Sequence, residues 1–222
     1  IDYMDSFKVF TWNKKNYKDP KKTLQKLTEM GYKPVTIIDP GVKKEDGYSV
    51  YEEGIKNGYL AFAAENELYV NEVWPGDSVF PSFTNPKVRS WWADKQKFLI
   101  DMGVRGVWND MNEPASFKGP LPDDVQFADE DDTAILHKDA HNIYGHCMAM
   151  ATKDGWLKYD GRRPFIITRA AYAGTQRYSL VWTGDNQSIW AHLQMAIPQL
   201  CNLGLSGFSY AGTDVGGFGA DT

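Results

Sequence analysis

GVWNDMNEPASF, residues 106–117, is the stretch that decides how this 222-residue sequence is interpreted. The apolar run over residues 104–108 has the length and composition of a buried strand. It stops at three polar side chains, Asp110, Asn112 and Glu113, and a proline follows at once. Carboxylates placed directly after a rigid strand are typical of functional residues on a loop. We therefore predict a strand over 104–108 that leads into a polar site.

The rest of the chain repeats this arrangement of an apolar run that ends at a charged residue. The other predicted strands, with the residues that end them, are 34–38 with Asp39, 164–168 with Arg169, 180–184 with Asp185, and 206–214 with Asp214. Apolar residues at helical spacing predict helices over 20–30, 49–57, 86–102, 137–157 and 188–203, the last kinked or broken at Pro198. Strands that alternate with helices predict a parallel sheet with helical crossovers.

Two architectures of the α/β class fit that alternation, a doubly wound sheet and a (β/α)8 barrel. A single aspartate after a strand is usually a cap for the next helix. Charged residues at the ends of five strands in succession are better explained by a barrel, in which catalytic groups come from the carboxyl ends of several strands. We predict a (β/α)8 TIM-barrel type.

Composition excludes several classes of function. Hydrophobic residues make up 42% and charged residues 24% of the sequence, as in soluble globular proteins. A net charge of -5 disfavours nucleic acid as a partner, and no apolar run approaches the length of a membrane span. The two cysteines, Cys147 and Cys201, fit a reducing compartment and are expected to be packed within helices. We expect a cytoplasmic protein, with secretion left open because the sequence does not begin with methionine.

Three further segments carry weaker signals. Residues 71–86 contain three prolines and predict a loop, and the acidic residues 118–133 predict a surface loop within one domain segment over 1–222. His137 and His141 are four residues apart with His146 beyond, a spacing that can hold zinc. Without a nearby cysteine or acid at ligand spacing, we interpret them as a structural helix face and predict no metal site.

Several carboxylates and one arginine around a pocket suit glycoside hydrolysis, although such a set can also bind a divalent cation. Two assignments are open on chemistry alone. Glu113 serves as acid/base if the site works like barrels with a catalytic Asn-Glu-Pro motif. Asp110 is instead the nucleophile if a later aspartate supplies the acid.

Six segments resemble glycoside hydrolase family 31, specifically its α-glucosidase branch. They are IDYMDSFKVFTW, VTIIDPGV, VWPGDSVFPSFTNP, GVWNDMNEPASF, RPFIITRAAYAGTQRYSLVWTGDNQSIWAHL and GTDVGGFG, in that order. The resemblance implies that Asp110 is the nucleophile and Asp185 the acid/base, with no cofactor. It implies that the substrate-binding residues are Asp39, Trp108, Met111, Arg169 and Asp214, with Trp74 and Phe218 as further apolar wall. Glu113 then orients its neighbours.

The resemblance covers nearly the whole sequence but only about the third to seventh strands of a barrel, so we expect an incomplete segment of a catalytic domain. The implied reaction is retaining hydrolysis of terminal non-reducing α-linked glucose from short oligosaccharides by double displacement. A non-catalytic carbohydrate-binding or structural fragment is the alternative from another class, and α-xylosidase or transglucosidase activity is the alternative within the family. Ser82 and Ala220 depart from the family pattern. The sequence does not indicate an oligomeric state.

Overall fold

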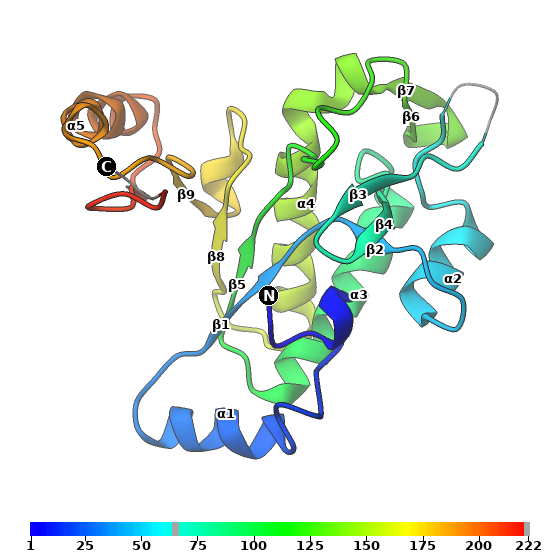
Figure 1. Cartoon of the computed structure of the whole chain (residues 1–222), viewed down its shortest axis with the longest axis horizontal. Coiled ribbons are helices and arrows are strands. Elements are labelled where there is room, and N and C mark those ends of the chain that lie inside the picture. Colours follow the sequence, from blue (N-terminus) through cyan, green and yellow to red (C-terminus); the bar gives the residue numbers. More distant parts are fainter. Residues whose placement is uncertain (64–66, 220–222) are drawn as a thin grey trace.

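The strands that carry the charged ends form one parallel sheet in the computed structural model, which describes residues 1–63 and 67–219 (Figure 1). Among these residues, five strands lie in the order β1-β5-β8-β9-β10. They are β1 (Val35–Ile38), β5 (Gly106–Asn109), β8 (Phe165–Thr168), β9 (Leu180–Trp182) and β10 (Ala211–Gly212). Every neighbouring pair is parallel. The spatial order follows the chain order, as a (β/α)8 barrel requires, and the predicted fold class is confirmed.

The last strand differs from its prediction over 206–214. Only Ala211 and Gly212 pair with β9, because the residues before them form a turn with a positive φ of 89° at Gly207. The connection from β8 to β9 is also unusual, since it consists of a loop with one short 3-10 helix, η4 (Thr175–Arg177).

The helices follow the predicted pattern closely. They are α1 (Pro20–Glu29), α2 (Ser49–Asn57), α3 (Pro86–Met102), α4 (His137–Tyr159) and α5 (Trp190–Leu205). The side chains of Asp19 and Asn85 accept hydrogen bonds from the first turns of α1 and α3, each of which begins with proline. Of the two alternatives predicted at Pro198, a kink or a break, the break does not occur, because α5 continues through the proline to Leu205.

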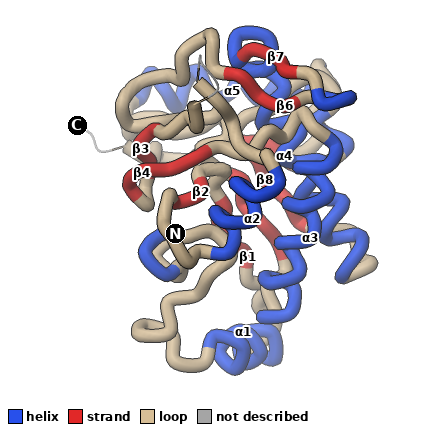
Figure 2. The backbone as a smooth tube through the Cα atoms, turned by 90° about the vertical axis from the view of Figure 1, so that its right-hand side faces the viewer, coloured by secondary structure: helices blue, strands red, loops and turns tan. Residues whose placement is uncertain are grey.

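Helices α3 and α4 run side by side along one face of the sheet, as both views show (Figures 1 and 2). They approach closely at Gly155, where a Cβ would lie 2.3 Å from the carbonyl oxygen of Ala93. The largest buried side chains gather around this contact. Trp92 of α3 packs edge-on against Phe83 and Phe10, and Tyr144 of α4 packs against Phe83. Helix α4 of this pair also contacts β5 and β8 of the sheet.

Two segments predicted as loops contain strands. Residues 71–86 include β3 (Asn71–Val73) and β4 (Gly76–Val79), which pair antiparallel with each other and with β2 (Val42–Lys43). The loop prediction failed there because the hairpin depends on a distant strand of two residues. The acidic segment contains β6 (Gln126–Ala128), which pairs with β7 (Ala134–Leu136), and a 3-10 helix, η3 (Glu130–Asp132). Leu121, Val125 and Phe127 of this acidic segment are buried in the hydrophobic core.

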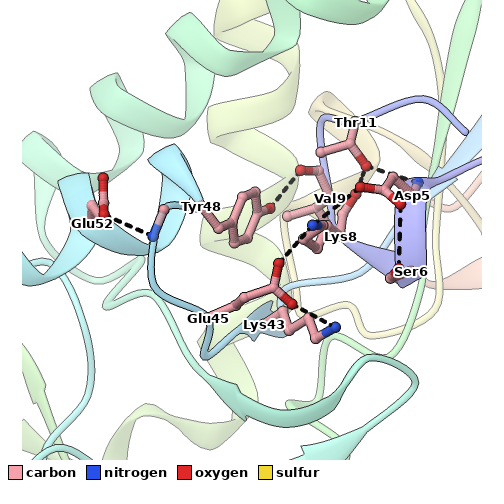
Figure 3. A network of polar contacts seen from close by, with 10 residues as sticks. Asp5, Ser6, Lys8, Val9, Thr11, Lys43, Glu45, Tyr48 and Glu52 are labelled. Atoms are coloured by element: carbon pink, nitrogen blue, oxygen red, sulfur yellow. Dashed lines mark hydrogen bonds and ion pairs between the residues drawn. The ribbon is translucent and has the colours of Figure 1, made fainter. Parts of the chain in front are cut away.

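A polar network fixes the start of the chain, which contains a 3-10 helix, η1 (Asp5–Phe7), against the region between β2 and α2 (Figure 3). The carboxylate of Glu45 lies 2.7 Å from Lys8 Nζ and 2.8 Å from Lys43 Nζ. The Tyr48 hydroxyl donates to the carbonyl oxygen of Val9 at 2.6 Å. Tyr3, a few residues earlier, donates to the carbonyl oxygen of Ile37 at 2.8 Å. The network therefore holds the first residues beside the carboxyl end of β1.

The β9–β10 end of the sheet is less covered. Helix α5 lies well away from α3 and α4 in Figure 1, and several of its apolar side chains are exposed, including Trp190 at 85% and Leu205 at 87%. In the described part of the chain, no helix is both long and apolar enough to cross a membrane.

Candidate active site

Asp110, Arg169 and Asp185 come together at the carboxyl ends of β5, β8 and β9. The register of β5 and β8 ends at the pair Asn109 and Thr168, so the next residue of each strand faces the same rim. Arg169 Nη1 lies 3.2 Å from Asp110 Oδ1 and 3.6 Å from Asp185 Oδ2. One nitrogen of one guanidinium therefore contacts both carboxylates that were predicted to be catalytic.

The other donors of Arg169 point to Glu113. Arg169 Nε and Nη2 donate to the two carboxylate oxygens of Glu113, both at 2.8 Å, in a bidentate pair. Arg169 Nη2 also lies 3.2 Å from the sulfur of Met111, a residue held at a positive φ of 55°. Glu113 has the geometry of a residue that orients Arg169.

Burial and charge act in opposite directions on Asp110. Its side chain is almost fully buried, which raises its pKa, whereas the positive charge of Arg169 and a hydrogen bond from the backbone N–H of Met111 lower it. The negative charges of Asp185 and Glu113 raise the pKa of Asp110, as burial does. The net effect is a raised pKa of Asp110, and the charge of Arg169 limits that rise.

Asp39, which follows β1, is the most deeply buried carboxylate of the rim, with an exposed fraction of 3%. Burial first, and the nearby charge of Asp110 second, raise its pKa to about 7. Its Oδ1 atom is buried and has no hydrogen-bond partner among the described residues. This oxygen is available to a ligand that enters the site.

Two tryptophans form an aromatic corner beside the carboxylates. Trp108 of β5 and Trp182 of β9 meet edge to face, with ring centroids 5.7 Å apart and an interplanar angle of 78°. Trp182 also lines a cleft of about 670 Å³ together with Glu113 and Arg169. Sequence analysis identified Trp108 but missed Trp182. Its position at the end of β9, three residues before Asp185, was the signal that could have revealed it.

Trp74 lies in the turn between β3 and β4 and is half exposed. Its ring packs at right angles to Phe117, with centroids 5.0 Å apart, and lies 6.4 Å from the ring of Phe7. The backbone N–H of Phe117 donates to the carbonyl oxygen of Glu72 at 2.8 Å, which attaches this hairpin to the segment that follows Asp110. Phe7 and Phe117 were not predicted, because only the folded chain brings three distant segments together.

Backbone groups of Asp214 and Phe218 contact Asn186, the residue after Asp185. Asn186 Nδ2 donates to the carbonyl oxygen of Asp214 at 3.0 Å, and the backbone N–H of Phe218 donates to the carbonyl oxygen of Asn186 at 2.8 Å. Asp214 and Asn186 line a cavity of about 270 Å³ that extends under Trp190. The Phe218 ring itself is exposed.

The remaining candidates lie elsewhere. His137 and His141 contact each other at 3.2 Å, whereas His146 lies 2.8 Å from the hydroxyl of Thr175. No group of three or more potential metal ligands occurs in residues 1–63 and 67–219. Cys147 is buried as expected, but Cys201 is exposed, so the prediction of a packed side chain was wrong for Cys201. Ser82 is buried, and Ala220 lies outside the described residues.

Carboxylates that converge around one arginine at the carboxyl ends of parallel barrel strands are the arrangement expected of glycoside hydrolases of the TIM-barrel class. Comparison with known families makes this specific. The chain belongs to glycosyl hydrolase family 31, since the model of that family's TIM-barrel domain matches residues 1–222.

Known relatives of the chain are α-glucosidases. It is 46% identical to alpha-glucosidase 2 of Bacillus thermoamyloliquefaciens over all of the chain and 28% of the relative. It is 40% identical to human neutral alpha-glucosidase AB over 98% of the chain and 24% of the relative. A crystal structure of glucosidase II alpha subunit, in an alpha3-Glc2-bound form, matches all of the chain and 24% of its own length, with a TM-score of 0.91 and 36% identity. The chain thus spans about a quarter of the length of these proteins.

Proposed function

We propose that the whole natural chain that carries these residues is a retaining α-glucosidase, which releases terminal non-reducing α-linked glucose from short oligosaccharides. The observation that carries the proposal is the placement of Arg169 Nη1 within 3.6 Å of both Asp110 and Asp185. Since both carboxylate oxygens contact one nitrogen, they lie less than about 7 Å apart, which is compatible with the short separation of retaining enzymes. The α-glucosidase relatives support the same activity.

In this proposal Asp110 attacks the anomeric carbon while Asp185 gives its proton to the leaving oxygen. The glycosidic bond breaks, the acceptor sugar leaves, and glucose remains bound to Asp110 as an ester. Asp185 then takes a proton from water, whose oxygen attacks the same carbon and restores the Asp110 carboxylate. Both steps invert the carbon, so the product is α-glucose. The reaction uses only protein carboxylates and water, and no cofactor takes part.

The neighbouring residues suit the binding of a neutral sugar. Asp39 offers a buried oxygen without a partner, and the indole N–H of Trp108 is likewise buried and unpaired among the described residues. These two groups can bond to hydroxyls of glucose, together with Asp214 of the last strand. Trp108 and Trp182 supply the apolar corner for a ring face, and Met111 adds apolar surface next to Arg169. Trp74 and Phe218 lie farther out as exposed apolar wall.

Two measurements on the whole natural chain test the proposal. Asp110→Asn, which keeps the size of the side chain, should lower the rate on an aryl α-glucoside by about four orders of magnitude or more and leave the fold intact. Asp46→Asn, at an exposed position, is the control. Near-normal activity of Asp110→Asn would move the nucleophile role to Glu113.

The second measurement is the stereochemistry of the first product, followed by NMR before mutarotation. The proposal expects α-glucose, and β-glucose would show inversion. A whole chain that binds oligosaccharide but hydrolyses none would favour the non-catalytic alternative. Release of xylose, or transfer of glucose to a second sugar in place of water, would favour the two alternatives within the family.

A further inference from the structure

Two buried asparagines flank Asp110, and each bonds to a fully buried threonine. Asn109, the last residue of β5, donates through Nδ2 to Thr152 Oγ1 of α4 at 3.1 Å. Asn112 donates through Nδ2 to Thr168 Oγ1 at 2.8 Å. Both pairs consist of an asparagine amide and a threonine hydroxyl, but they join different elements of the fold. The first pair joins the strand to a helix, whereas the second joins the turn after β5 to the strand that leads to Arg169.

The amide of Asn112 continues the pairing of β5 and β8 beyond the end of the sheet. The backbone N–H of Arg169 donates to the carbonyl oxygen of Asn109 at 3.0 Å. One residue later, the backbone N–H of Ala170 donates to Asn112 Oδ1 at 2.9 Å, and Thr168 Oγ1 donates to the carbonyl oxygen of Ala170 at 3.0 Å. The backbone is therefore held on both sides of Arg169.

The side chain of Arg169 is held by the residue next to Asn112. Glu113 accepts two hydrogen bonds from Nε and Nη2, which leaves Nη1 between Asp110 and Asp185. A turn of four residues thus contains the nucleophile candidate, the anchor of the Arg169 backbone and the anchor of its guanidinium.

Helix α4 supports this turn from behind. A Cβ at Gly145 would lie 2.7 Å from the carbonyl oxygen of Asn112 and 2.8 Å from that of Ala170, so the helix backbone touches both connected segments. Asn112 and Thr168 have no exposed surface. A buried amide is costly unless its polar groups are bonded, and both ends of the Asn112 amide are bonded here. These contacts fix the orientation of the Asn112 amide group.

We propose that Asn112 is a positioning residue, which together with Thr168 fixes Arg169 where its Nη1 meets Asp110 and Asp185. The inference rests on the proposed function and adds to it a residue that touches neither substrate nor the reacting atoms. Displacement of a catalytic group by about 1 Å can lower a rate about 100-fold, so a loosened Arg169 should be visible in turnover.

The experiment compares variants of the whole natural chain. Asn112→Ala and Thr168→Val should each lower kcat on an aryl α-glucoside by about 100-fold. The double variant should be no more than about threefold worse than either, because both remove the same contact. Thr168→Ser keeps the hydroxyl and should recover most of the lost rate.

Thr152→Val is the matched control. It removes a hydroxyl that is equally buried, that also accepts from an asparagine Nδ2, and that also donates to a backbone carbonyl, in this case that of Met148. We expect Thr152→Val and Thr168→Val each to lower Tm by several degrees. Thr152→Val should nevertheless keep kcat within about twofold of wild type. An equal loss of kcat in Thr152→Val and Thr168→Val would overturn the proposal. The lower kcat would then be explained by a general loss of stability and not by the position of Arg169.

Two further measurements separate a positioning role from a structural one. The positive charge of Arg169 lowers the pKa of Asp110, so the acid limb of kcat/KM should move to higher pH in Asn112→Ala and stay in place in Thr152→Val. Crystal structures should show Arg169 Nη1 withdrawn from Asp110 in Asn112→Ala but not in Thr152→Val.

An unmoved Arg169 in that structure, with kcat unchanged, would overturn the role of Asn112. Failure of the proposed function has a different signature, since the wild-type chain would then lack α-glucosidase activity. The position of Arg169 in the two variant structures decides the role of Asn112 in that case as well.

Discussion

Arg169 divides its donors between two kinds of neighbour. Two of its nitrogens bond to Glu113, while the third faces Asp110 and Asp185. Three carboxylates around one guanidinium leave negative charge in excess at this rim. The buried Asp39 lies close enough to Asp110 that the charge of Asp110 raises the pKa of Asp39. Such a site suits a neutral, hydroxyl-rich ligand and repels an anionic one.

Asp185 can be tested through the leaving group of the substrate. In the whole natural chain, Asp185→Ala should slow the hydrolysis of maltose by about 10²–10⁴-fold more than that of an aryl glucoside, because a phenolate departs with little help from an acid. Azide needs no general base, so it should restore part of the turnover and give α-glucosyl azide. Equal losses on both substrates without an azide product would leave Asp185 as a substrate ligand only.

Asp39 predicts a specific dependence of stability on pH. Its pKa is about 7 in the folded chain, against an ordinary value of 3.8. Between these pH values the folded state keeps a proton that the unfolded state has lost, so the free energy of unfolding falls as the pH rises from about 4 to about 7. The free energy of unfolding of Asp39→Asn should match that of wild type near pH 4 and exceed it at pH 8 by on the order of 4 kcal/mol.

Denaturant unfolding at the two pH values measures this difference. Asp46→Asn provides the background of the same substitution at an exposed position. Equal stability of Asp39→Asn and wild type at pH 8 would show that the buried carboxyl has no destabilising charge there.

Most of the rim could be predicted from sequence because each charged residue directly follows an apolar run. The aromatic neighbours could not be predicted in the same way. Phe117 meets Trp74 only because the β3–β4 hairpin folds onto the turn after β5. A contact of this kind depends on tertiary packing, which leaves no local pattern in the sequence.

At the scale of elements, the close approach of α3 and α4 can be tested with two glycines. Gly155→Ala in α4 should lower the free energy of unfolding by about 2–4 kcal/mol, because the new methyl group would collide with the backbone of α3 at Ala93. Gly204→Ala in α5, with nothing within 4 Å of the new methyl, should be neutral or stabilising by up to about 1 kcal/mol.

Chemical denaturation of both variants, in the whole natural chain, gives the comparison. If Gly155→Ala is as stable as wild type, the two helices can move apart without a loss in the free energy of unfolding. The pair of variants thus separates the cost of the close contact from the helix preference of alanine itself.

The helices and the central strands could be predicted because each is determined by its own periodicity and caps. Helix α3 shows both signals, with Asn85 before proline at its start and Gly103 at its end. The elements that failed depend on partners. The β3–β4 hairpin needs β2, and the short β10 pairs with β9 for only two residues. Helix α5 was expected to be kinked or broken at Pro198, and it continues through the proline without a break.

At the scale of the whole molecule, the chain has a well-packed side and an open one. Trp92, Trp156 and Tyr144 are fully buried around α3 and α4, whereas α5 and the residues after β10 expose Trp190, Leu205 and Val215. Apolar surface of this extent promotes association when it is left uncovered.

The 222-residue chain expressed by itself should therefore bind an apolar dye such as ANS and self-associate in solution. Replacing both Trp190 and Leu205 by glutamate should reduce dye binding and shift the chain toward monomer in analytical ultracentrifugation. The double replacement of Met30 and Tyr32, which are exposed near α1, by glutamate serves as the control. Equal effects of the two double variants would show that the α5 side has no special role.

The short connection between β8 and β9 also sets an order of assembly during folding. Ile167 pairs with Leu180, whereas β1 and β5, whose pairing joins Val35 to Gly106, are separated by a far longer stretch of chain. Closing a longer loop costs more chain entropy, so the β8–β9 pair has the lower kinetic barrier. We therefore expect the segments that carry Arg169 and Asp185 to meet early in folding, before β1 adds Asp39 to the edge of β5.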